Sequence, residues 1–146
     1  MEADFKFSGA EASLIVHATE DREKILKSLS DSLEIPSEKF ATTPSEGHYK
    51  NKILTLNAVL SSSEANDLAS RIVSGLNSTD RQELVRAIGE FSDEKGNLYL
   101  RLDKQRLCHG KVSMSFSDSI RIKFKPVKRY RPISNLENYR GLFSSE

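Results

Sequence analysis

A dense run of cationic side chains, RIKFKPVKRYR from Arg121 to Arg131, is the part of the sequence with the clearest chemical capacity. Six of its eleven residues are lysine or arginine, and Tyr130 lies among them. Lysine and arginine neutralise phosphates and release counterions, while an exposed tyrosine offers a ring on which an unpaired base can stack. Lysines on an edge strand can also serve only to prevent aggregation. That explanation does not cover Lys128 and Arg129, which follow the strand, so the tract favours an anionic partner: RNA, DNA, anionic lipid or an acidic protein.

The segment GNLYLRLDKQ, residues 96–105, carries a second set of polar side chains at strand spacing. Alternation places its leucines on one face of a strand and Tyr99 and Arg101 on the other. The run SIRIKFKP, residues 119–126, alternates in the same way and places its cations on one face. If the apolar sides of both strands face the interior, the cations share one surface. The residues expected to contact the anionic partner here are Tyr99, Arg101, Lys104, Arg121, Lys123 and Lys125.

A polar segment between two strands, EGHYKNK at residues 46–52, is a second candidate for binding. Gly47 gives the backbone freedom to turn. A plain polar connector explains the composition equally well. The side chains that would supply hydrogen-bond donors and an aromatic ring are those of His48, Tyr49, Lys50 and Asn51.

Catalysis and metal binding find little support in the sequence. The three histidines, His17, His48 and His109, are far apart, and no local motif joins one of them to a nucleophile. The single cysteine, Cys108, excludes an internal disulfide and a cysteine-cluster metal site. His17 and the acids of HATED, residues 17–21, could be imagined as metal ligands, but the start of a helix explains the same acids. We therefore expect a protein that is not an enzyme and that uses no metal or cofactor.

Charge is distributed unevenly along this chain of 146 residues, whose net charge is +1. Residues 1–98 have a net charge of −6, whereas residues 99–131 hold ten lysines and arginines against two acids, a net charge of +8. Neutralisation of acidic helices by basic strands within the fold is one explanation. An anionic partner is the other, and it is the one that the asymmetry favours.

The distribution of apolar residues argues against a membrane protein. No apolar run approaches the roughly 20 residues that a membrane-spanning helix needs. Glu2 and Asp4 precede the first apolar run, which is the reverse of the order in a secretory signal. We expect a cytoplasmic protein with no membrane partner.

Alternation and helical periodicity predict the elements of the first half of the chain. A strand at residues 11–18 is followed by a helix that Thr19 caps and that ends before Pro36. A short strand at about residues 39–42 and a clear strand at residues 52–60 come next.

Two further helices are each introduced by residues with the spacing of a capping box. The first follows Ser61, with Glu64 as its partner, and the second follows Thr79, with Gln82 as its partner. Gly96 is then placed to adopt the left-handed conformation after a helix.

The remaining chain reads as three strands, at residues 98–102, 111–116 and 119–125. Ser117 and Asp118 suit a tight turn, so we expect the last two strands to form a hairpin. The order β-α-β-α-α-β-β-β predicts a single α+β domain with an antiparallel or mixed sheet of about five strands and helices packed on one face.

The domain is expected over residues 1–127, followed by a tail at residues 128–146 that is basic and then amphipathic. The tail either forms an amphipathic turn that docks on the body or on a partner, or is disordered. The apolar side chains of such a turn would be Leu136, Tyr139, Leu142 and Phe143.

Three stretches together resemble a known family: HATED at residues 17–21, EGHYKNKILTL at 46–56 and GNLYLRLDKQ at 96–105, the last followed by SIRIKFKP. Over about residues 8–127 they are similar, in order and spacing, to small archaeal proteins classed as predicted RNA-binding proteins or predicted exosome subunits. The resemblance implies a compact α+β domain related to a ribosomal-protein fold, and RNA binding alongside RNA processing or degradation by the archaeal exosome. It supplies no catalytic residues. The positions that match its motifs are His48, Tyr49, Asn51, Arg101, Asp103, Lys104 and Gln105.

We therefore expect a non-catalytic RNA-binding protein that uses a basic sheet face and the C-terminal basic tract. Single-stranded or structured RNA is the expected partner, with exosome subunits as further partners, and a homodimer is compatible with the sequence. The alternative is a protein-interaction subunit whose basic face binds an acidic protein. The full set of expected RNA contacts adds the loop residues His48, Tyr49, Lys50 and Asn51 and the tract residues Lys128, Arg129 and Arg131 to the strand residues given above.

Overall fold

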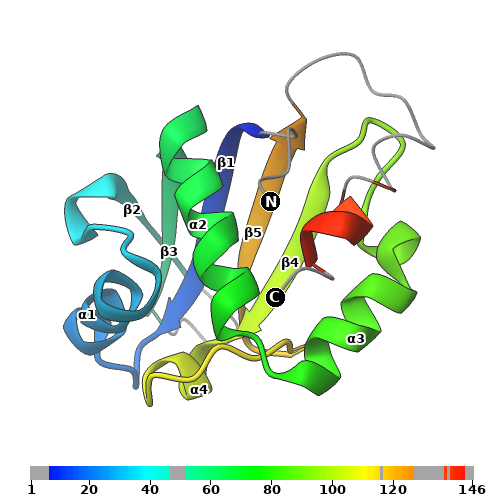
Figure 1. Ribbon diagram of the computed structural model, residues 1–146. Helices are drawn as coiled ribbons and strands as arrows, with labels where there is room; N and C mark the ends of the chain where they lie inside the picture. Colours follow the sequence, from blue (N-terminus) through cyan, green and yellow to red (C-terminus); the bar gives the residue numbers. More distant parts are fainter. Residues whose placement is uncertain (1–6, 47–51, 116, 127–136, 138, 144–146) are drawn as a thin grey trace.

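Five antiparallel strands form one sheet, and the helices lie on one of its faces (Figure 1). The computed structural model describes residues 7–46, 52–115, 117–126, 137 and 139–143. The strand order is β2-β3-β1-β5-β4, and every neighbouring pair is antiparallel. The strands are β1 (Phe7–His17), β2 (Phe40–Glu46), β3 (Lys52–Leu60), β4 (Leu98–Asp103) and β5 (Ser119–Pro126).

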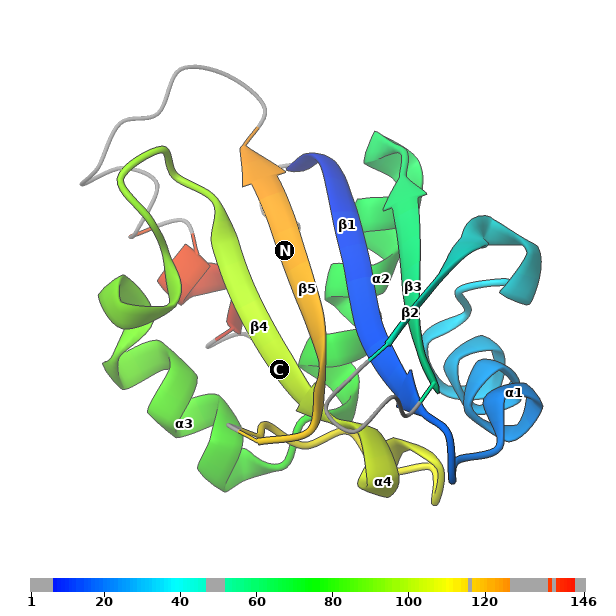
Figure 2. The same ribbon diagram turned by 180° about the vertical axis from the view of Figure 1, so that it is seen from behind.

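The opposite face of the sheet is free of these helices (Figure 2). No helix in the described part of the chain is long and apolar enough to span a membrane. The predicted α+β class, the single five-stranded sheet and the placing of the helices on one face are confirmed. The helices are α1 (Arg22–Leu33), α2 (Ser62–Gly75), α3 (Ser78–Arg86) and the short α4 (Lys104–Leu107), with 3-10 turns η1 (Ser37–Lys39) and η3 (Ile88–Phe91).

The core lies between the sheet and the helical layer. Helix α2 contacts β1, and small buried side chains on both elements, among them Ala12 and Ala65, let the two approach closely. Around them pack larger aliphatic and aromatic side chains. One inward-facing row crosses all five strands in register, and each of its side chains is buried: Leu100, Ile122, Ala12, Ala58 and Phe40.

The predicted capping box at the start of α2 is confirmed. Ser61 Oγ accepts a hydrogen bond from the backbone N–H of Glu64 at 3.2 Å, and Glu64 Oε1 accepts one from the backbone N–H of Ser61 at 2.9 Å. Two backbone donors that the first helical turn would leave unpaired are thereby satisfied.

Replacing Ser61 by alanine is expected to lower the free energy of unfolding by about 1 kcal/mol, because the N–H of Glu64 loses its acceptor. Urea denaturation followed by circular dichroism measures the change. Ser63→Ala, at an exposed position in the same helical turn, is the control and should leave the unfolding midpoint nearly unchanged. Equal midpoints for the two variants would contradict a stabilising role for the cap.

The two other predicted caps are displaced by two residues in the structure. Helix α1 begins after Asp21 rather than Thr19, and the Asp21 side chain accepts a backbone hydrogen bond at 3.2 Å. Helix α3 begins after Asn77 rather than Thr79, and the Asn77 side chain accepts a backbone hydrogen bond at 2.8 Å. Aspartate and asparagine are stronger caps than threonine, which explains why the helices begin at them.

The predicted hairpin between residues 111–116 and 119–125 is wrong. Strand β5 pairs instead with β4 on one side and with β1 on the other. The described residues 111–115 form only isolated bridges, with Leu76 and Leu102, beside the outer edge of β4. The chain leaves β4 through α4 and covers this edge before it returns as β5, so the apolar alternation of the segment serves edge packing rather than a new strand.

A helical turn at residues 139–143 docks on the body beside α3 and β4 (Figure 1). Tyr139 and Phe143 are fully buried, and the Tyr139 ring stacks on Phe7 with 5.7 Å between ring centroids. The Tyr139 hydroxyl donates a hydrogen bond to the carbonyl of Gly96, whose φ of 88° is the left-handed conformation that the sequence predicted. This turn is therefore part of the folded body.

Candidate nucleic-acid interface

We call the sheet face opposite the helices the open face (Figure 2). The burial patterns of β4 and β5 place the cations of these two strands on it. Their predicted alternation is confirmed, because the leucines of β4 and the apolar residues of β5 are buried while the polar residues between them are not. Direct pairing of β4 with β5 brings the two segments together. We call the resulting group the cationic patch: Tyr99, Arg101, Arg121, Lys123 and Lys125.

Two arginines lie at the centre of the cationic patch. Arg101 of β4 and Arg121 of β5 are directly opposite each other in the ladder, and both are exposed. Neither forms an ion pair with another described residue. Like charges placed opposite one another destabilise a sheet, so this pair costs folding free energy that a bound anion would offset.

Tyr99 is held in a fixed position beside these arginines. Its hydroxyl donates a hydrogen bond to Asp93 Oδ2 at 2.9 Å, and Lys123 Nζ lies 5.9 Å from the centroid of its ring. Burial and the Asp93 carboxylate raise the pKa of Tyr99, so the hydroxyl remains a donor at neutral pH. With 37% of the residue exposed, the ring is a pre-positioned surface on which a base could stack.

The acid within the cationic patch is Glu11 on β1. Its carboxylate lies 2.7 Å from Lys125 Nζ and stands opposite Lys123 across the ladder. The hydrogen bond from Lys125 lowers the pKa of Glu11, so the carboxylate is ionised at neutral pH. Lys125 is therefore partly neutralised, whereas Arg101 and Arg121 keep their full charge.

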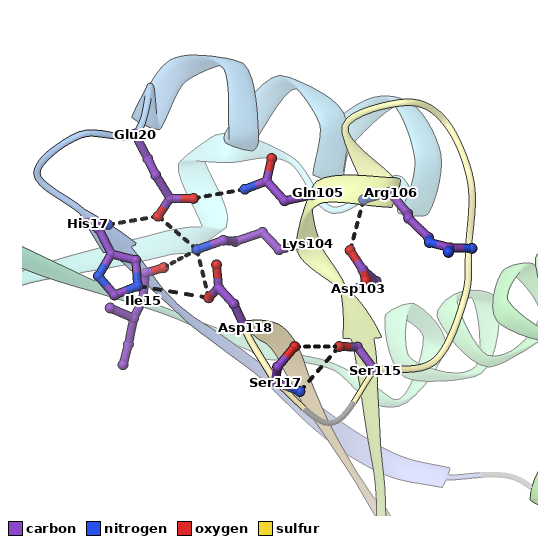
Figure 3. Close-up of polar contacts among 10 residues, drawn as sticks. All are labelled: Ile15, His17, Glu20, Asp103, Lys104, Gln105, Arg106, Ser115, Ser117 and Asp118. Carbon is purple, nitrogen blue, oxygen red and sulfur yellow. Dashed lines mark hydrogen bonds and ion pairs between the residues drawn. The ribbon is translucent and has the colours of Figure 1, made fainter.

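Lys104, which the sequence predicted as a contact to RNA, is fully buried and does not belong to the cationic patch. Its ammonium group donates hydrogen bonds to the Ile15 carbonyl at 2.7 Å and to Glu20 Oε1 at 2.8 Å, and it lies 3.0 Å from Asp118 Oδ1 (Figure 3). The prediction is corrected for a physical reason: β4 ends at Asp103, and α4 turns the next side chain inward.

We call the group around the buried Lys104 the ion cluster, and it joins two of the sequence motifs at one end of the sheet: Lys104, Glu20, Asp118, His17 and Gln105. Glu20 comes from HATED, and Lys104 and Gln105 come from GNLYLRLDKQ. Glu20 Oε1 accepts a hydrogen bond from the backbone N–H of His17 at 2.9 Å, and Oε2 accepts one from Gln105 Nε2 at 3.1 Å (Figure 3). The cluster ties the end of β1 to the end of β4 and to the loop before β5, which fixes the strands that carry the cationic patch.

The oxygen and nitrogen atoms of this cluster do not fit a metal ion. Side-chain atoms of His17, Glu20 and Asp118 lie within 4.8 Å of one another, a spacing that a metal could bridge. The Lys104 ammonium, however, already contacts both carboxylates from a buried position. A cation at the same point would meet this fixed positive charge, so the arrangement is an ion-pair cluster rather than a metal site.

The cluster makes stability depend on pH through Glu20. Burial alone would raise the pKa of Glu20, but hydrogen bonds from Lys104 and from the N–H of His17 outweigh it and hold the pKa below the ordinary 4.5. Stability contributed by the ionised carboxylate is therefore present above that value and is lost as the pH falls through the folded pKa.

The free energy of unfolding is expected to fall more steeply below pH 4.5 in the wild-type protein than in Glu20→Gln. Urea denaturation at a series of pH values measures both curves. Glu23→Gln, which removes an exposed carboxylate three residues later in the first turn of α1, should retain the wild-type slope. Parallel wild-type and Glu20→Gln curves would contradict the role of Glu20.

The remaining predicted contacts fall outside the described residues. The strand ends that flank the loop pair with one another, Glu46 with Lys52, and the next residue, Ile53, lies opposite His17. The remaining motif, EGHYKNKILTL, therefore begins at the end of β2 and continues into the start of β3, both of which lie at the end of the sheet that carries the ion cluster. The contacts outside the described residues are His48, Tyr49, Lys50, Asn51, Lys128, Arg129 and Arg131.

Sequence reasoning missed two members of the ion cluster. The sequence explained Glu20 by the start of a helix in preference to a metal site with His17, and Asp118 by a tight turn. Each explanation accounts for the residue type locally and gives no reason to look for a distant lysine. The strand alternation, in contrast, signalled the cationic patch correctly because it is a local property.

Comparison with known proteins agrees with these observations. A family model described as RNA binding matches residues 10–126. The RNA-binding protein PAB1135 of Pyrococcus abyssi is 32% identical over 124 residues, which cover 78% of this chain and 80% of that protein.

Solved structures share the whole fold. Protein AF2318 of Archaeoglobus fulgidus is 29% identical with a TM-score of 0.78, and the match covers 94% of this chain and 99% of that one. Mth689 of Methanothermobacter thermautotrophicus, a DUF54 protein, is 26% identical with a TM-score of 0.77 over 94% and 98% of the two chains. The extent of the family match and of the Pyrococcus relative shows that this chain belongs to the RNA-binding family.

Proposed function

We propose that this protein is a non-catalytic, cytoplasmic RNA-binding module that holds RNA against the cationic patch. The observation that carries the proposal is the pair Arg101 and Arg121, exposed, directly opposite and without an acidic partner among the described residues. A phosphate between two guanidinium groups would accept forked hydrogen bonds from both and relieve their repulsion. The family match supports RNA as the anion.

Single-stranded or irregular RNA fits this surface better than a regular duplex. The patch lies on a sheet, and the helices of the described part of the chain lie on the other face. The bases of a regular RNA duplex are stacked on one another and offer no free face to a protein ring, whereas unpaired bases do. Tyr99 supplies a fixed ring beside the arginines, which suits the exposed face of an unpaired base.

The proposal includes two groups that lie outside the described residues. Lys128, Arg129 and Arg131 follow the end of β5 and would extend the cationic patch beyond Pro126. His48, Tyr49, Lys50 and Asn51 lie between β2 and β3 and would offer donors and a ring at the other end of the sheet.

Salt dependence of RNA binding tests the proposal. If about five cations engage single-stranded RNA, log affinity should fall with log salt concentration with a slope of roughly −3.5. The variant Lys123→Gln/Lys125→Gln/Arg129→Gln should bind more weakly and with a shallower slope. An affinity that does not depend on salt, or equal affinities for the two proteins, would reject the cationic patch as the binding surface.

The proposed setting is RNA processing or degradation in association with the exosome, which the resemblance to the archaeal family of predicted RNA-binding proteins and exosome subunits implies. Affinity capture of the tagged protein from archaeal cells, with and without nuclease, tests this setting. Recovery of exosome subunits would support it. Recovery of an acidic partner that survives nuclease, together with no binding to purified RNA, would replace RNA binding by binding to a protein.

A further inference from the structure

The open face is divided into a charged half and an uncharged half. Strands β4 and β5 carry the cationic patch. On β1, the outward positions between Glu11 and His17 hold uncharged side chains, and so do the outward positions of β3 and β2 beside them. We call this group the neutral half: Ser13, Ile15, Thr55, Asn57, Val59, Ala41 and Thr43.

The composition of the neutral half is unusual for this chain. Charged residues make up 29% of the sequence, yet none of the seven residues of the neutral half is charged, although they lie on the side of the sheet that normally faces water. Ile15 is 45% exposed and Val59 is 63% exposed. With Tyr99, they are the exposed large apolar side chains of the described residues, and all three lie on the open face. Apolar exposure concentrated on one surface marks a site of interaction.

Hydrogen-bonding capacity in the neutral half is also unused. The side chains of Ser13, Thr55 and Asn57 form no hydrogen bond with any described residue, and Asn57 is exposed. An asparagine amide offers two donors and one acceptor, and each hydroxyl offers a donor and acceptors. These groups match the donors and acceptors on the edges of unpaired bases.

The two halves are in register. One outward row crosses all five strands in the order Arg101, Arg121, Ser13, Asn57 and Ala41. Since neighbouring strands lie about 4.8 Å apart, Asn57 stands about 10 Å from Arg121 across the sheet. Along this single row, charged side chains on β4 and β5 are therefore followed directly by uncharged side chains on β1, β3 and β2.

We propose that the neutral half binds the unpaired bases of the RNA strand whose phosphates lie on the cationic patch. This inference rests on the proposed function and adds how the RNA is oriented. A single RNA strand has the same division as the open face, with a charged backbone on one side and neutral polar rings on the other. The strand would run along β5, with its bases directed across β1 and β3, where Asn57 and Thr55 contact base edges and Ile15 and Val59 contact base planes.

An oligomer of ribose phosphate without bases separates the two halves, because it has the charge of RNA and nothing to bind the neutral half. The wild-type protein is expected to bind single-stranded RNA at least about tenfold more tightly than the abasic oligomer of equal length. The variant Asn57→Ala/Val59→Ala should bind RNA about fivefold to tenfold more weakly, with unchanged affinity for the abasic oligomer and an unchanged salt slope.

Two controls keep the outcomes distinct. Arg101→Gln/Arg121→Gln should weaken binding of both oligomers, and Ser70→Ala/Thr79→Ala, two exposed polar residues of α2 and α3, should weaken neither. Urea denaturation confirms that each variant is folded.

Three results would overturn the inference. Equal wild-type affinity for RNA and the abasic oligomer would show that bases are not bound, and the proposed function would stand. Absence of binding to either oligomer would reject the proposed function and this inference together. A wild-type dimer that Val59→Lys converts to a monomer without loss of RNA affinity would show that a second copy of the chain covers the neutral half.

Discussion

Replacing Lys104 by methionine is expected to lower the free energy of unfolding by about 3 kcal/mol. The lysine is fully buried, and its ammonium contacts three oxygens, of Ile15, Glu20 and Asp118. Without it, Glu20 keeps a charge that is 85% removed from solvent and has lost its ion-pair partner. Removing one partner of a buried ion pair usually costs about 3 to 5 kcal/mol, and we expect the lower value because Asp118 is half exposed and can be hydrated again.

Urea denaturation followed by circular dichroism measures this loss. Lys111→Met is the matched control, because Lys111 is exposed and forms no ion pair with a described residue; its effect should be small. The double variant Lys104→Met/Glu20→Gln should recover part of the stability, since the unpaired carboxylate is then absent. Lys104→Met as stable as Lys111→Met would contradict the ion cluster.

RNA binding by the same variant distinguishes a structural lysine from a phosphate contact. Under conditions where Lys104→Met is folded, its salt slope for RNA binding should equal that of the wild-type protein, because no phosphate contact has been removed. A slope shallower by about 0.7 would instead show that Lys104 contacts a phosphate of single-stranded RNA.

The second large effect is expected at the arginine pair. Arg101→Gln/Arg121→Gln should weaken binding of single-stranded RNA by at least about tenfold and make the salt slope shallower by about 1.4, because two phosphate contacts are lost. The same variant should be more stable than the wild-type protein by up to about 1 kcal/mol, because the repulsion between opposite arginines disappears.

A control variant removes the same charge from the helical layer. Arg71→Gln/Arg86→Gln replaces two exposed arginines that form ion pairs with Glu34 and Glu83. It should retain the wild-type affinity for RNA and should be no more stable than the wild-type protein. Equal losses of affinity in the two double variants would show that net charge, and not the cationic patch, determines binding.

A variant Arg101→Gln/Arg121→Gln that is more stable than the wild-type protein but binds RNA more weakly would show that the two arginines serve binding rather than folding. A pair of like charges that destabilises the free protein is explained when a ligand of opposite charge binds it, because function can outweigh a modest loss of stability. If Arg101→Gln/Arg121→Gln loses both stability and affinity, the arginines serve the fold, and the main support for the proposed function is removed.

Local features of the chain were predicted well because they depend on neighbouring residues alone. The strand at residues 52–60 has the predicted bounds, and the capping box of Ser61 and Glu64 has the predicted contacts. Alternation in β4 and β5 identified correctly which side chains face outward. Strand period and helix capping act within a few residues, so they can be read from one sequence.

Errors arose where distant residues determine the outcome. Residues 111–116 alternate like a strand, yet the described part of this segment packs beside β4 because β5 takes the place between β4 and β1. Lys104 continues a row of polar residues, yet it is buried because Glu20 and Asp118 compensate for its charge. Burial of a lysine depends on partners that lie 84 residues away in the case of Glu20, and a local pattern contains no record of them.

The sequence by itself determined the class of the fold, the two cationic strands and the residues on their polar faces. Only the tertiary structure decided that β4 and β5 are neighbours, that Arg101 therefore faces Arg121, and that β1 and β3 continue the same surface without charge. The alternation of polar and apolar residues indicates on which face of its own strand a side chain lies. Which strands share a surface depends instead on strand pairing and register. The division of the open face into a cationic and a neutral half is thus a property of the assembled sheet, and it is where the interaction with RNA can be tested most directly.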